Sequence, residues 1–265
     1  MTGGLLGVFA HPDDETYSMG GALARYTDEG IPATILCFTR GEAGMIAQGS
    51  GATRDNLGEV REAELRAACA CVGVTDVRIV GTADSGTERT ADGVAAIAAT
   101  MGELQPRVVV TMEPMGVTHH PDHIAVSAMT TDAFHLVRGE SGGAYPRRLY
   151  HSAIPASFLD ALARATEELG VPSFSDPNDP LAPRAAPDDS IACVVDVGRW
   201  VDRKAAALRA HLTQSNEMIA WLPENLYPIV FGNETFQRPY PERAPGEEVE
   251  LEMFAALRAA DGSLR

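Results

Sequence analysis

The stretch GVFAHPDDETYSMGGALARY (residues 7–26) decides the fold, because a buried strand in it runs straight into a helix. Apolar residues continue up to Ala10, and a helical pattern begins a few positions later. Between them stand four ionisable residues: His11, Asp13, Asp14 and Glu15. In open parallel sheets ligands bind beyond the carboxyl ends of the strands, so this cluster stands where a functional site is expected.

Short apolar runs alternate with longer helical patterns along the whole chain. The expected strands are Leu5–Ala10, Thr34–Thr39, Val77–Gly81, Val108–Met112, Leu149–Ile154 and Ile191–Val197. The expected helices lie near 15–29, 58–72, 91–104, 121–137, 157–169 and 198–214. This alternation predicts an α/β, Rossmann-like fold in one domain over residues 1–265, with a mostly parallel sheet flanked by helices.

Two irregular segments are expected as loops that border the site. Residues 41–56 are rich in glycine and follow a strand end, and residues 171–190 are rich in proline and aspartate. Loops of this kind carry binding residues when they lie beyond the ends of parallel strands. The alternative is that both are simply solvated surface loops.

Composition excludes several classes of partner. With 21 basic and 37 acidic residues the net charge is −16, and an acidic chain of this kind repels nucleic acid. The chain has no run of ~20 apolar residues and no basic segment before its first apolar run, so neither a membrane span nor a signal peptide is expected. Four cysteines without a C-x-x-C pair predict free thiols in a reducing cytoplasm. The partner that remains after these exclusions is a small-molecule substrate. Composition does not exclude a homo-oligomer.

The motif AHPDDE (residues 10–15) has the residue types of a metal site. His11 and Asp14 are three positions apart across a turn, so that imidazole and carboxylate can converge on one point. Neutral imidazole and carboxylate oxygen together suit a zinc-like divalent ion. The alternative is a helix cap, since acids in the first turn of a helix also interact favourably with its dipole.

A second motif, VTHHPDHIAV (residues 117–126), follows the strand expected at Val108–Met112. His120 and His123 are three positions apart, which brings both to one side of the first helical turn. Asp122 is available to fix a histidine tautomer by hydrogen bonding. A surface histidine cluster without function is the alternative. Together the two motifs supply two histidines and one aspartate, and three protein ligands with an open position are typical of a catalytic zinc site.

AHPDDE followed about a hundred residues later by HPDH resembles the LmbE/PIG-L-type zinc deacetylases. These include deacetylases of N-acetylglucosaminyl-phosphatidylinositol and of bacillithiol and mycothiol precursors, and the mycothiol conjugate amidase. Three further segments are similar to the family's R-x-x-E-L helix, D-S-G loop and late helix: REAELRAAC (61–69), ADSG (83–86) and KAAALRAHLTQ (204–214). The resemblance therefore covers most of the chain.

The resemblance implies a role for each matching residue. The metal ligands would be His11, Asp14 and His123, and the metal would be zinc, with iron as the alternative. Asp13 would be the general base that deprotonates the attacking water.

The remaining assignments also come from the resemblance. His120 would stabilise the oxyanion or protonate the leaving amine, and Asp122 would orient it. Arg61 and Asp84 match positions that contact the sugar, although an arginine on a helix can equally form a surface ion pair. Members that act on mycothiol precursors have Tyr-Gly before HPDH, where this chain has Thr118 and His119. This difference argues against a mycothiol-type substrate, and it leaves His119 either in the pocket or in solvent.

The predicted function is hydrolysis of an N-acetyl or other N-acyl group on an amino-sugar conjugate through a metal-activated water. The alternatives are an amidase for larger N-acyl or S-conjugated substrates and a non-catalytic metal-binding family member. A nucleotide-binding dehydrogenase is disfavoured, because acids rather than a glycine-rich loop follow the first strand. A serine hydrolase is disfavoured because no G-x-S-x-G occurs. The aromatic-rich tail 221–248 is expected to pack over the site or to line a sugar pocket.

Overall fold

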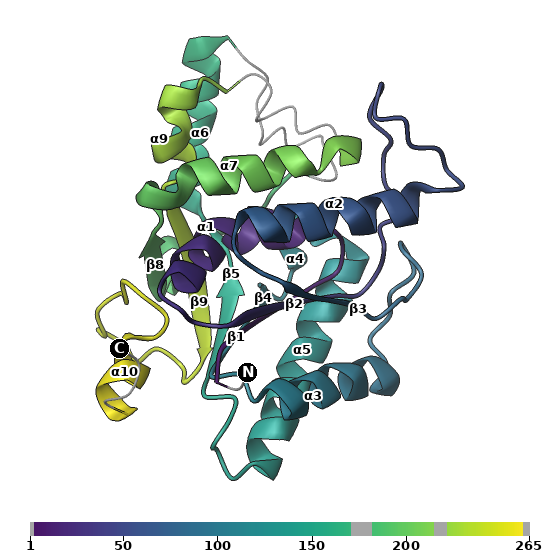
Figure 1. The fold of residues 1–265 in the computed structure, drawn as a ribbon. Helices are drawn as coiled ribbons and strands as arrows, with labels where there is room; N and C mark the ends of the chain where they lie inside the picture. Colours follow the sequence, from purple (N-terminus) through teal and green to yellow (C-terminus); the bar gives the residue numbers. More distant parts are fainter. Residues whose placement is uncertain (1–2, 171–181, 215–221, 262–265) are drawn as a thin grey trace.

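A computed structural model describes residues 3–170, 182–214 and 222–261. Its centre is a seven-stranded sheet in the order β3-β2-β1-β4-β5-β9-β8 (Figure 1). Five strands are parallel: β1 (Leu5–Phe9), β2 (Ala33–Cys37), β3 (Asp76–Ile79), β4 (Val108–Met112) and β5 (Arg148–Ser152). The predicted Rossmann-like α/β fold with a mostly parallel sheet is confirmed.

Helices cover both faces of this sheet. On one face lie α1 (Asp14–Asp28), α2 (Leu57–Cys71) and α7 (Val201–Ala210), and on the other lie α3 (Ala91–Leu104) and α5 (Pro121–Glu140) (Figure 1). The alternation of side chains along a strand explains the two layers. In β1, Leu5 and Phe9 pack beneath α1 and α2, whereas Leu6 and Val8 pack against α3 and α5.

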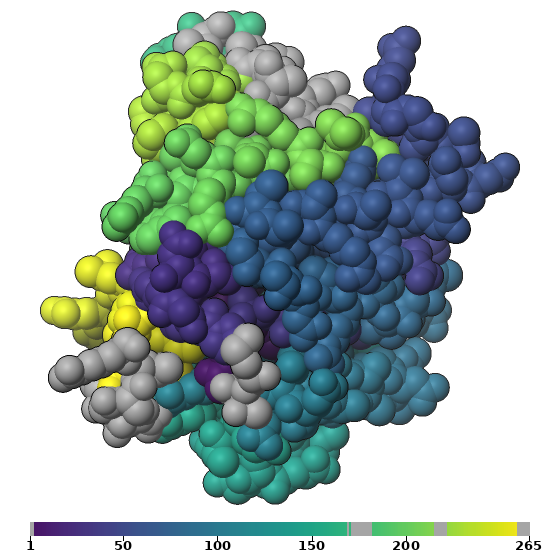
Figure 2. Space-filling view, viewed as in Figure 1, coloured from purple at the N-terminus to yellow at the C-terminus, as the bar shows by residue number. Residues whose placement is uncertain are grey.

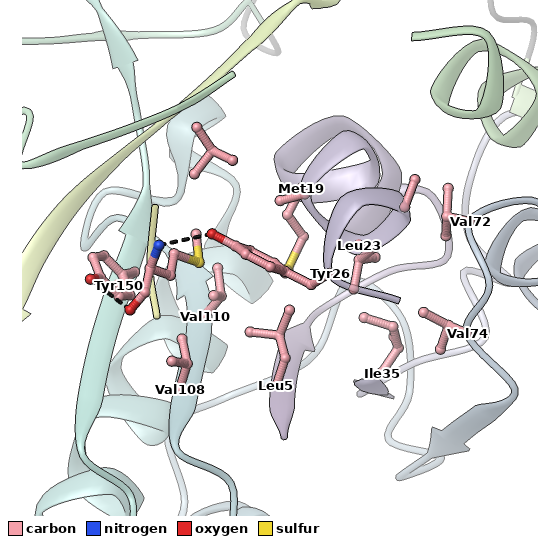
Figure 3. Close-up of a cluster of buried hydrophobic side chains, with 14 of the residues drawn as sticks. Leu5, Met19, Leu23, Tyr26, Ile35, Val72, Val74, Val108, Val110 and Tyr150 are labelled. Carbon is pink, nitrogen blue, oxygen red and sulfur yellow. Dashed lines mark hydrogen bonds between the residues drawn. The ribbon is translucent and has the colours of Figure 1, made fainter. Parts of the chain in front are cut away.

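The core beneath α1 is drawn in Figure 3. Met19, Leu23 and Tyr26 of α1 point toward strand residues such as Leu5 and Ile35. Full burial of one such side chain contributes about 1.5–3 kcal/mol to the free energy of unfolding. The buried Tyr26 hydroxyl accepts a hydrogen bond of 2.8 Å from the backbone N–H of Met253, which ties the C-terminal segment to the core.

The last two strands run antiparallel to their neighbours. β9 (Asn233–Tyr240) pairs with β5 on one side and β8 (Cys193–Asp196) on the other. The strand predicted at Ile191–Val197 is therefore present as β8, but β9 was not expected. Its sequence does not resemble a buried strand, because Glu234 and Arg238 are charged and yet buried.

Smaller elements complete the structure. β6 (Ile154–Pro155) and β7 (Ala185–Ala186) form a two-stranded parallel sheet, and α4 (Gly116–His119) precedes α5. The helices α6 (Ala156–Leu169) and α9 (Tyr227–Phe231) lie together at one end, and α10 (Ala255–Asp261) lies at the C-terminus (Figure 1).

In Figure 2 the side chains of α1, α2 and α7 form a continuous layer over one face of the sheet. Among the described residues, no helix combines the length and the apolar character that crossing a bilayer requires. All four cysteines are free thiols, as expected, and three of them are buried.

Candidate metal centre

The two histidine-containing motifs meet because the strands before them are neighbours. β1 and β4 pair in parallel, with Leu5 opposite Val108, so their carboxyl ends lie side by side. The structure gathers all the predicted site residues at this edge: His11, Asp13, Asp14, Arg61, Asp84, His120, Asp122 and His123.

Three side chains converge with the spacing of metal ligands. His11 Nδ1 lies 3.0 Å from His123 Nε2. Asp14 Oδ2 lies 3.6 Å from His11 Nδ1, and the other oxygen, Oδ1, lies 3.4 Å from His123 Nε2. A tetrahedral zinc ion with bonds of about 2.0–2.1 Å holds its ligand atoms about 3.3 Å apart. The arrangement fits one ion between these three groups.

The hydrogen bonds of the two rings place lone pairs where a cation would lie. His123 Nδ1 is 2.9 Å from the carbonyl oxygen of Gly116, which can only accept, so Nδ1 carries the proton. His11 Nε2 is 3.3 Å from an Asp122 oxygen and 3.1 Å from an Asp84 oxygen, so Nε2 donates on that ring. His11 Nδ1 and His123 Nε2 then face each other at 3.0 Å. With both rings neutral, their lone pairs are placed to bind one shared cation, and in its absence a proton on His11 Nδ1 can be donated to His123 Nε2.

Charge at the centre also favours a cation. Burial opposes the charged form of His11, but the carboxylates of Asp122, Asp14 and Asp84 outweigh this effect and raise the pKa of the ring. Burial likewise favours the neutral acid of Asp14, yet His123 and His11 hold its pKa well below the usual range. An arrangement of three acids around two imidazoles is thus suited to a divalent ion.

Backbone geometry fixes the position of His123. Gly116 has a φ of +70°, and a Cβ at this position would lie 2.5 Å from the Cβ of His123. Glycine is therefore needed for the carbonyl of residue 116 to approach the ring. The next residues are also unusual, because Val117 and His119 have positive φ values of 61° and 60°.

Asp122 has a different partner from the one we expected. Its carboxylate accepts hydrogen bonds from the backbone N–H groups of Ser85 (2.8 Å) and Thr87 (3.1 Å) and contacts His11. Only its backbone N–H reaches His120, donating to Nδ1 at 3.2 Å. The loop after β3 turns the carboxylate away from His120, so Asp122 orients His11 instead.

Asp13 is held in a strained conformation beside a buried arginine. Its φ is 116°, in the region that favours glycine. Arg61 donates to an Asp13 oxygen at 3.2 Å and to the carbonyl oxygen of Pro12 at 2.6 Å. Arg61 is only 3% exposed, so it is not a surface ion pair. Burial raises the pKa of Asp13 to about 6, and Arg61 opposes this shift.

Glu15 and His211 belong to the hydrogen-bond network around Asp13, although no role was predicted for either residue. The Glu15 carboxylate accepts a hydrogen bond of 3.0 Å from the backbone N–H of Asp13. His211 Nε2 lies 3.3 Å from the other Glu15 oxygen, and both residues are buried. A role for both residues could have been inferred from the sequence, because each lies inside a segment that resembles the family.

His120 and Asp84 complete the first layer around His11. The His120 ring meets the His11 ring edge-on, with centroids 4.8 Å apart. Burial and the neighbouring His11 and His123 lower the pKa of His120, which favours the neutral ring. Asp84 uses one oxygen for His11 and accepts from the backbone N–H of Ala43 at 2.7 Å with the other.

The residues before HPDH are also placed. Thr118 directs its hydroxyl to 3.4 Å from His123 Nδ1, whereas His119 is exposed. Of the two alternatives for His119, the pocket and the solvent, the structure has the side chain in solvent.

A cavity of about 410 Å³ adjoins the centre, with Asp14 and His123 in its wall. Val230 and Phe231, from the aromatic-rich tail 221–248, are among the residues that line this cavity. Trp221 of the same tail lies outside the described residues. Part of the tail therefore lines a cavity beside the centre, and its predicted role in a sugar pocket stays a prediction.

Fold and site together define a class of protein: a hydrolase with an α/β fold and a candidate metal centre. The centre lies between β1 and β4, where the strand order of the sheet reverses direction. Residues 6–134 match the family model described as PIG-L: GlcNAc-PI de-N-acetylase. A 1D-myo-inositol 2-acetamido-2-deoxy-alpha-D-glucopyranoside deacetylase of Geodermatophilus obscurus is 36% identical over 96% of this chain and 97% of its own. The chain belongs to the PIG-L family of deacetylases, which confirms the resemblance.

Solved structures share the fold. The conserved protein TT1542 of Thermus thermophilus is 25% identical with a TM-score of 0.63, over 92% of this chain and 98% of that one. A 4-carboxy-2-hydroxymuconate hydratase of Pseudomonas putida is 18% identical with a TM-score of 0.64, over 94% and 100%. Because the second protein is a hydratase, the fold alone does not fix the chemistry.

Proposed function

We propose that this protein is a zinc-dependent hydrolase that removes an N-acetyl group, or a related N-acyl group, from an amino-sugar conjugate. The observation that carries the proposal is the pair of imidazole nitrogens, His11 Nδ1 and His123 Nε2, that face each other at 3.0 Å beside the Asp14 carboxylate. The 36% identical relative acts on a 2-acetamido-2-deoxy-glucopyranoside, which supports an acetylated amino sugar as the substrate class. Iron is the alternative metal.

The three converging residues His11, Asp14 and His123 would hold the ion. Zinc held by these residues would supply a Lewis acid for the amide carbonyl and would lower the pKa of a bound water from ~15.7 toward 7. Asp13 takes the proton of the attacking water as general base, a role that fits its carboxylate beside Asp14 and its hydrogen bond from Arg61. The protonated Asp13 then gives its proton to the departing nitrogen, which leaves acetate and a free amine.

His120 stabilises the negative charge that develops on the carbonyl oxygen. Its Nδ1 accepts from the backbone of Asp122, so Nε2 carries the proton of the neutral ring and is the available donor. Asp122 and Asp84 orient His11, and Arg61 positions Asp13. Asp84 retains oxygen lone pairs for a sugar hydroxyl, so its predicted substrate contact is compatible with its protein contacts.

The experiment is to measure metal content and acetate release in the same preparations. Zinc-loaded protein should contain close to one divalent ion per chain and release acetate from N-acetylglucosamine conjugates. Chelation should abolish release, and added zinc should restore it. His123→Ala should lose both metal and turnover, whereas His119→Ala, an exposed neighbour in the same motif, should keep both. A protein that binds no zinc, or one whose zinc-loaded form cleaves neither N-acetyl- nor longer N-acylglucosamine conjugates, would contradict the proposal.

The proposal also includes a cytoplasmic location, a possible homo-oligomer and a single domain over residues 1–265. The loops near 41–56 and 171–190 were expected to border the site, and residues 171–181 lie outside the described part of the chain. In support, Gly41 accepts a hydrogen bond from Arg61 at 2.9 Å, and Pro183 lines the cavity beside the centre.

A further inference from the structure

The cavity beside the candidate metal centre is larger than an acetyl group requires. It measures about 410 Å³, and Asp14 and His123 form part of its wall. A methyl group is comparable in size to a water molecule, whose share of liquid volume is ~30 Å³. An acetyl methyl placed next to the ligands would leave most of this space unused.

The lining of the cavity is mainly apolar. Its apolar side chains include Ile154, Phe158, Leu159, Leu162, Val230 and Phe231. Residues 158, 159 and 162 lie on one face of α6, since their spacing matches the helical repeat. A surface of this composition excludes water and favours a hydrocarbon group.

Several polar groups of the wall are engaged with the protein. Lys204 Nζ lies 2.7 Å from a Glu234 oxygen, and each residue is 4% exposed, so the pair presents little net charge to a ligand. Thr235 donates its hydroxyl to the carbonyl oxygen of Ala153 at 2.6 Å. The Ser152 hydroxyl is buried and has no hydrogen-bond partner among the described residues.

The opposite side of the centre is polar, and the strand order explains why. β1 and β4 carry the ligands in the middle of the sheet, and the loops after β2 and β3 lie to one side. These loops hold Asp84 and Glu42, joined by a 3.0 Å hydrogen bond from the backbone N–H of Asp84. α6 and α9 lie on the other side, next to β5 and β9 (Figure 1). A sugar finds hydroxyl partners on the first side, and a hydrocarbon chain fits the second.

We infer that the cavity takes the acyl side of the amide and that the preferred substrates carry a straight N-acyl chain of several carbons. This inference rests on the proposed function, because it assigns the two sides of the bond that the site would cleave. Water adds across the amide C–N bond, which gives a carboxylate of the longer chain and a free amine. Each methylene that enters the cavity is expected to raise kcat/KM about fourfold, the equivalent of ~0.8 kcal/mol.

The test compares N-acetyl-, N-butanoyl- and N-hexanoylglucosamine with the zinc-loaded protein, measured as released amine. We expect kcat/KM at least 10-fold higher for the hexanoyl than for the acetyl substrate. If the acetyl substrate is cleaved equally well or better, the inference is overturned and the proposed function stands. If no member of the series is cleaved, the proposed function fails and the inference falls with it.

Two tryptophan variants locate the effect. Leu162→Trp fills the cavity, so the ratio of hexanoyl to acetyl kcat/KM should fall toward one. Leu136→Trp makes the same substitution at an exposed position of α5 and should leave the ratio at the wild-type value. An unchanged ratio in Leu162→Trp would show that the chain binds elsewhere and would overturn the assignment.

A last comparison separates the acyl chain from the group on the sugar. Octyl and methyl glycosides of N-acetylglucosamine should have kcat/KM values within about threefold of each other, because the octyl group would lie on the polar side. A 10-fold or larger gain for the octyl glycoside would mean that the cavity takes the amine side of the substrate. That outcome would overturn the inference.

Discussion

The two sides of the candidate metal centre use charge in opposite ways. On the side of β2 and β3, buried charged groups surround the ionisable residues of the site, as Arg61 does for Asp13 and Asp84 for His11. On the side of β5 and β9, the buried charges Lys204 and Glu234 neutralise each other within an otherwise apolar wall. Burial of a charged side chain therefore does not by itself indicate a catalytic role. The groups that the charged side chain faces do.

The functions of the two sides follow from these partners. The groups on the polar side contact ring nitrogens or the carboxylate of Asp13, so a change there alters protonation or geometry at the reacting atoms. The Glu234 carboxylate accepts instead from the backbone N–H groups of Gly21 (2.8 Å) and Ala22 (2.7 Å). These groups lie just after Met19, where the φ of −154° interrupts α1. The pair on the apolar side thus stabilises the fold, and the following variants test this division.

The largest effect is expected for Asp13→Asn on the polar side. The amide cannot accept the proton of water, so kcat should fall about 10²–10⁴-fold. Zinc content should stay unchanged, because Asp13 is not among the three converging ligands. Asp160→Asn, the same change at an exposed position of α6, is the control and should have wild-type kcat. Near-normal turnover in Asp13→Asn would remove the distinction between the two sides.

Lys204→Met on the apolar side should lower stability rather than chemistry. It leaves the Glu234 carboxylate buried without its cation, which costs about 3–5 kcal/mol in the free energy of unfolding. Urea denaturation measures this loss, and the folded fraction should still bind zinc. Adding Glu234→Gln should recover part of the stability, since the unpaired charge is then removed. A single variant as stable as the wild type would show that the pair is not structural.

A histidine behind the apolar wall gives a pH-dependent test. His151 lies next to Ser152 in β5, contacts the Thr131 hydroxyl at 3.3 Å, and burial lowers its pKa from 6.5 to about 4. Between these values the unfolded chain takes up a proton that the folded protein does not, so stability falls as pH falls. From pH 7 to pH 5 the wild type should lose about 2 kcal/mol more than His151→Gln. Equal losses in urea titrations of both proteins would contradict this assignment.

The smallest effect is expected for Glu15→Gln, one step behind Asp13. The change replaces one of two carboxylate oxygens, which accept from the Asp13 backbone and face His211. Losing one such hydrogen bond costs about 1–2 kcal/mol, so kcat should fall roughly 10-fold with little change in KM or zinc content. Glu168→Gln, at an exposed position of α6, is the control. A change in KM alone would place Glu15 in substrate binding instead.

The parallel half of the fold and the members of the site could be predicted from the sequence. The strand residues Val108–Met112 are a continuous apolar run, as expected when both faces of a sheet are covered. The position of the candidate site could be predicted because both histidine-containing motifs stand directly after such strands. Local spacing is sufficient when neighbouring strands end at the same edge.

What could not be predicted depends on contacts between distant segments. β9 contains Glu234 and Arg238, whose buried charges are paired with residues from other segments, Lys204 for Glu234 and Glu247 and Glu250 for Arg238. His211 reaches Glu15 across 196 positions, and no local pattern signals that contact. The partner of Asp122 also depended on how the loop after β3 folds back, which brings Ser85 and Thr87 to the carboxylate.

The late position of β9 has a consequence for the growing chain. Glu234 follows His123, the last of the three converging ligands, by 111 positions (234 − 123). At synthesis rates of about 5–20 residues per second, this interval lasts roughly 5–20 s. During that time a nascent chain already holds all three proposed ligands, while the strand that joins α1 to α7 has not been made. Ion capture can therefore precede completion of the apolar wall, and the order of synthesis separates the two halves of the site in time.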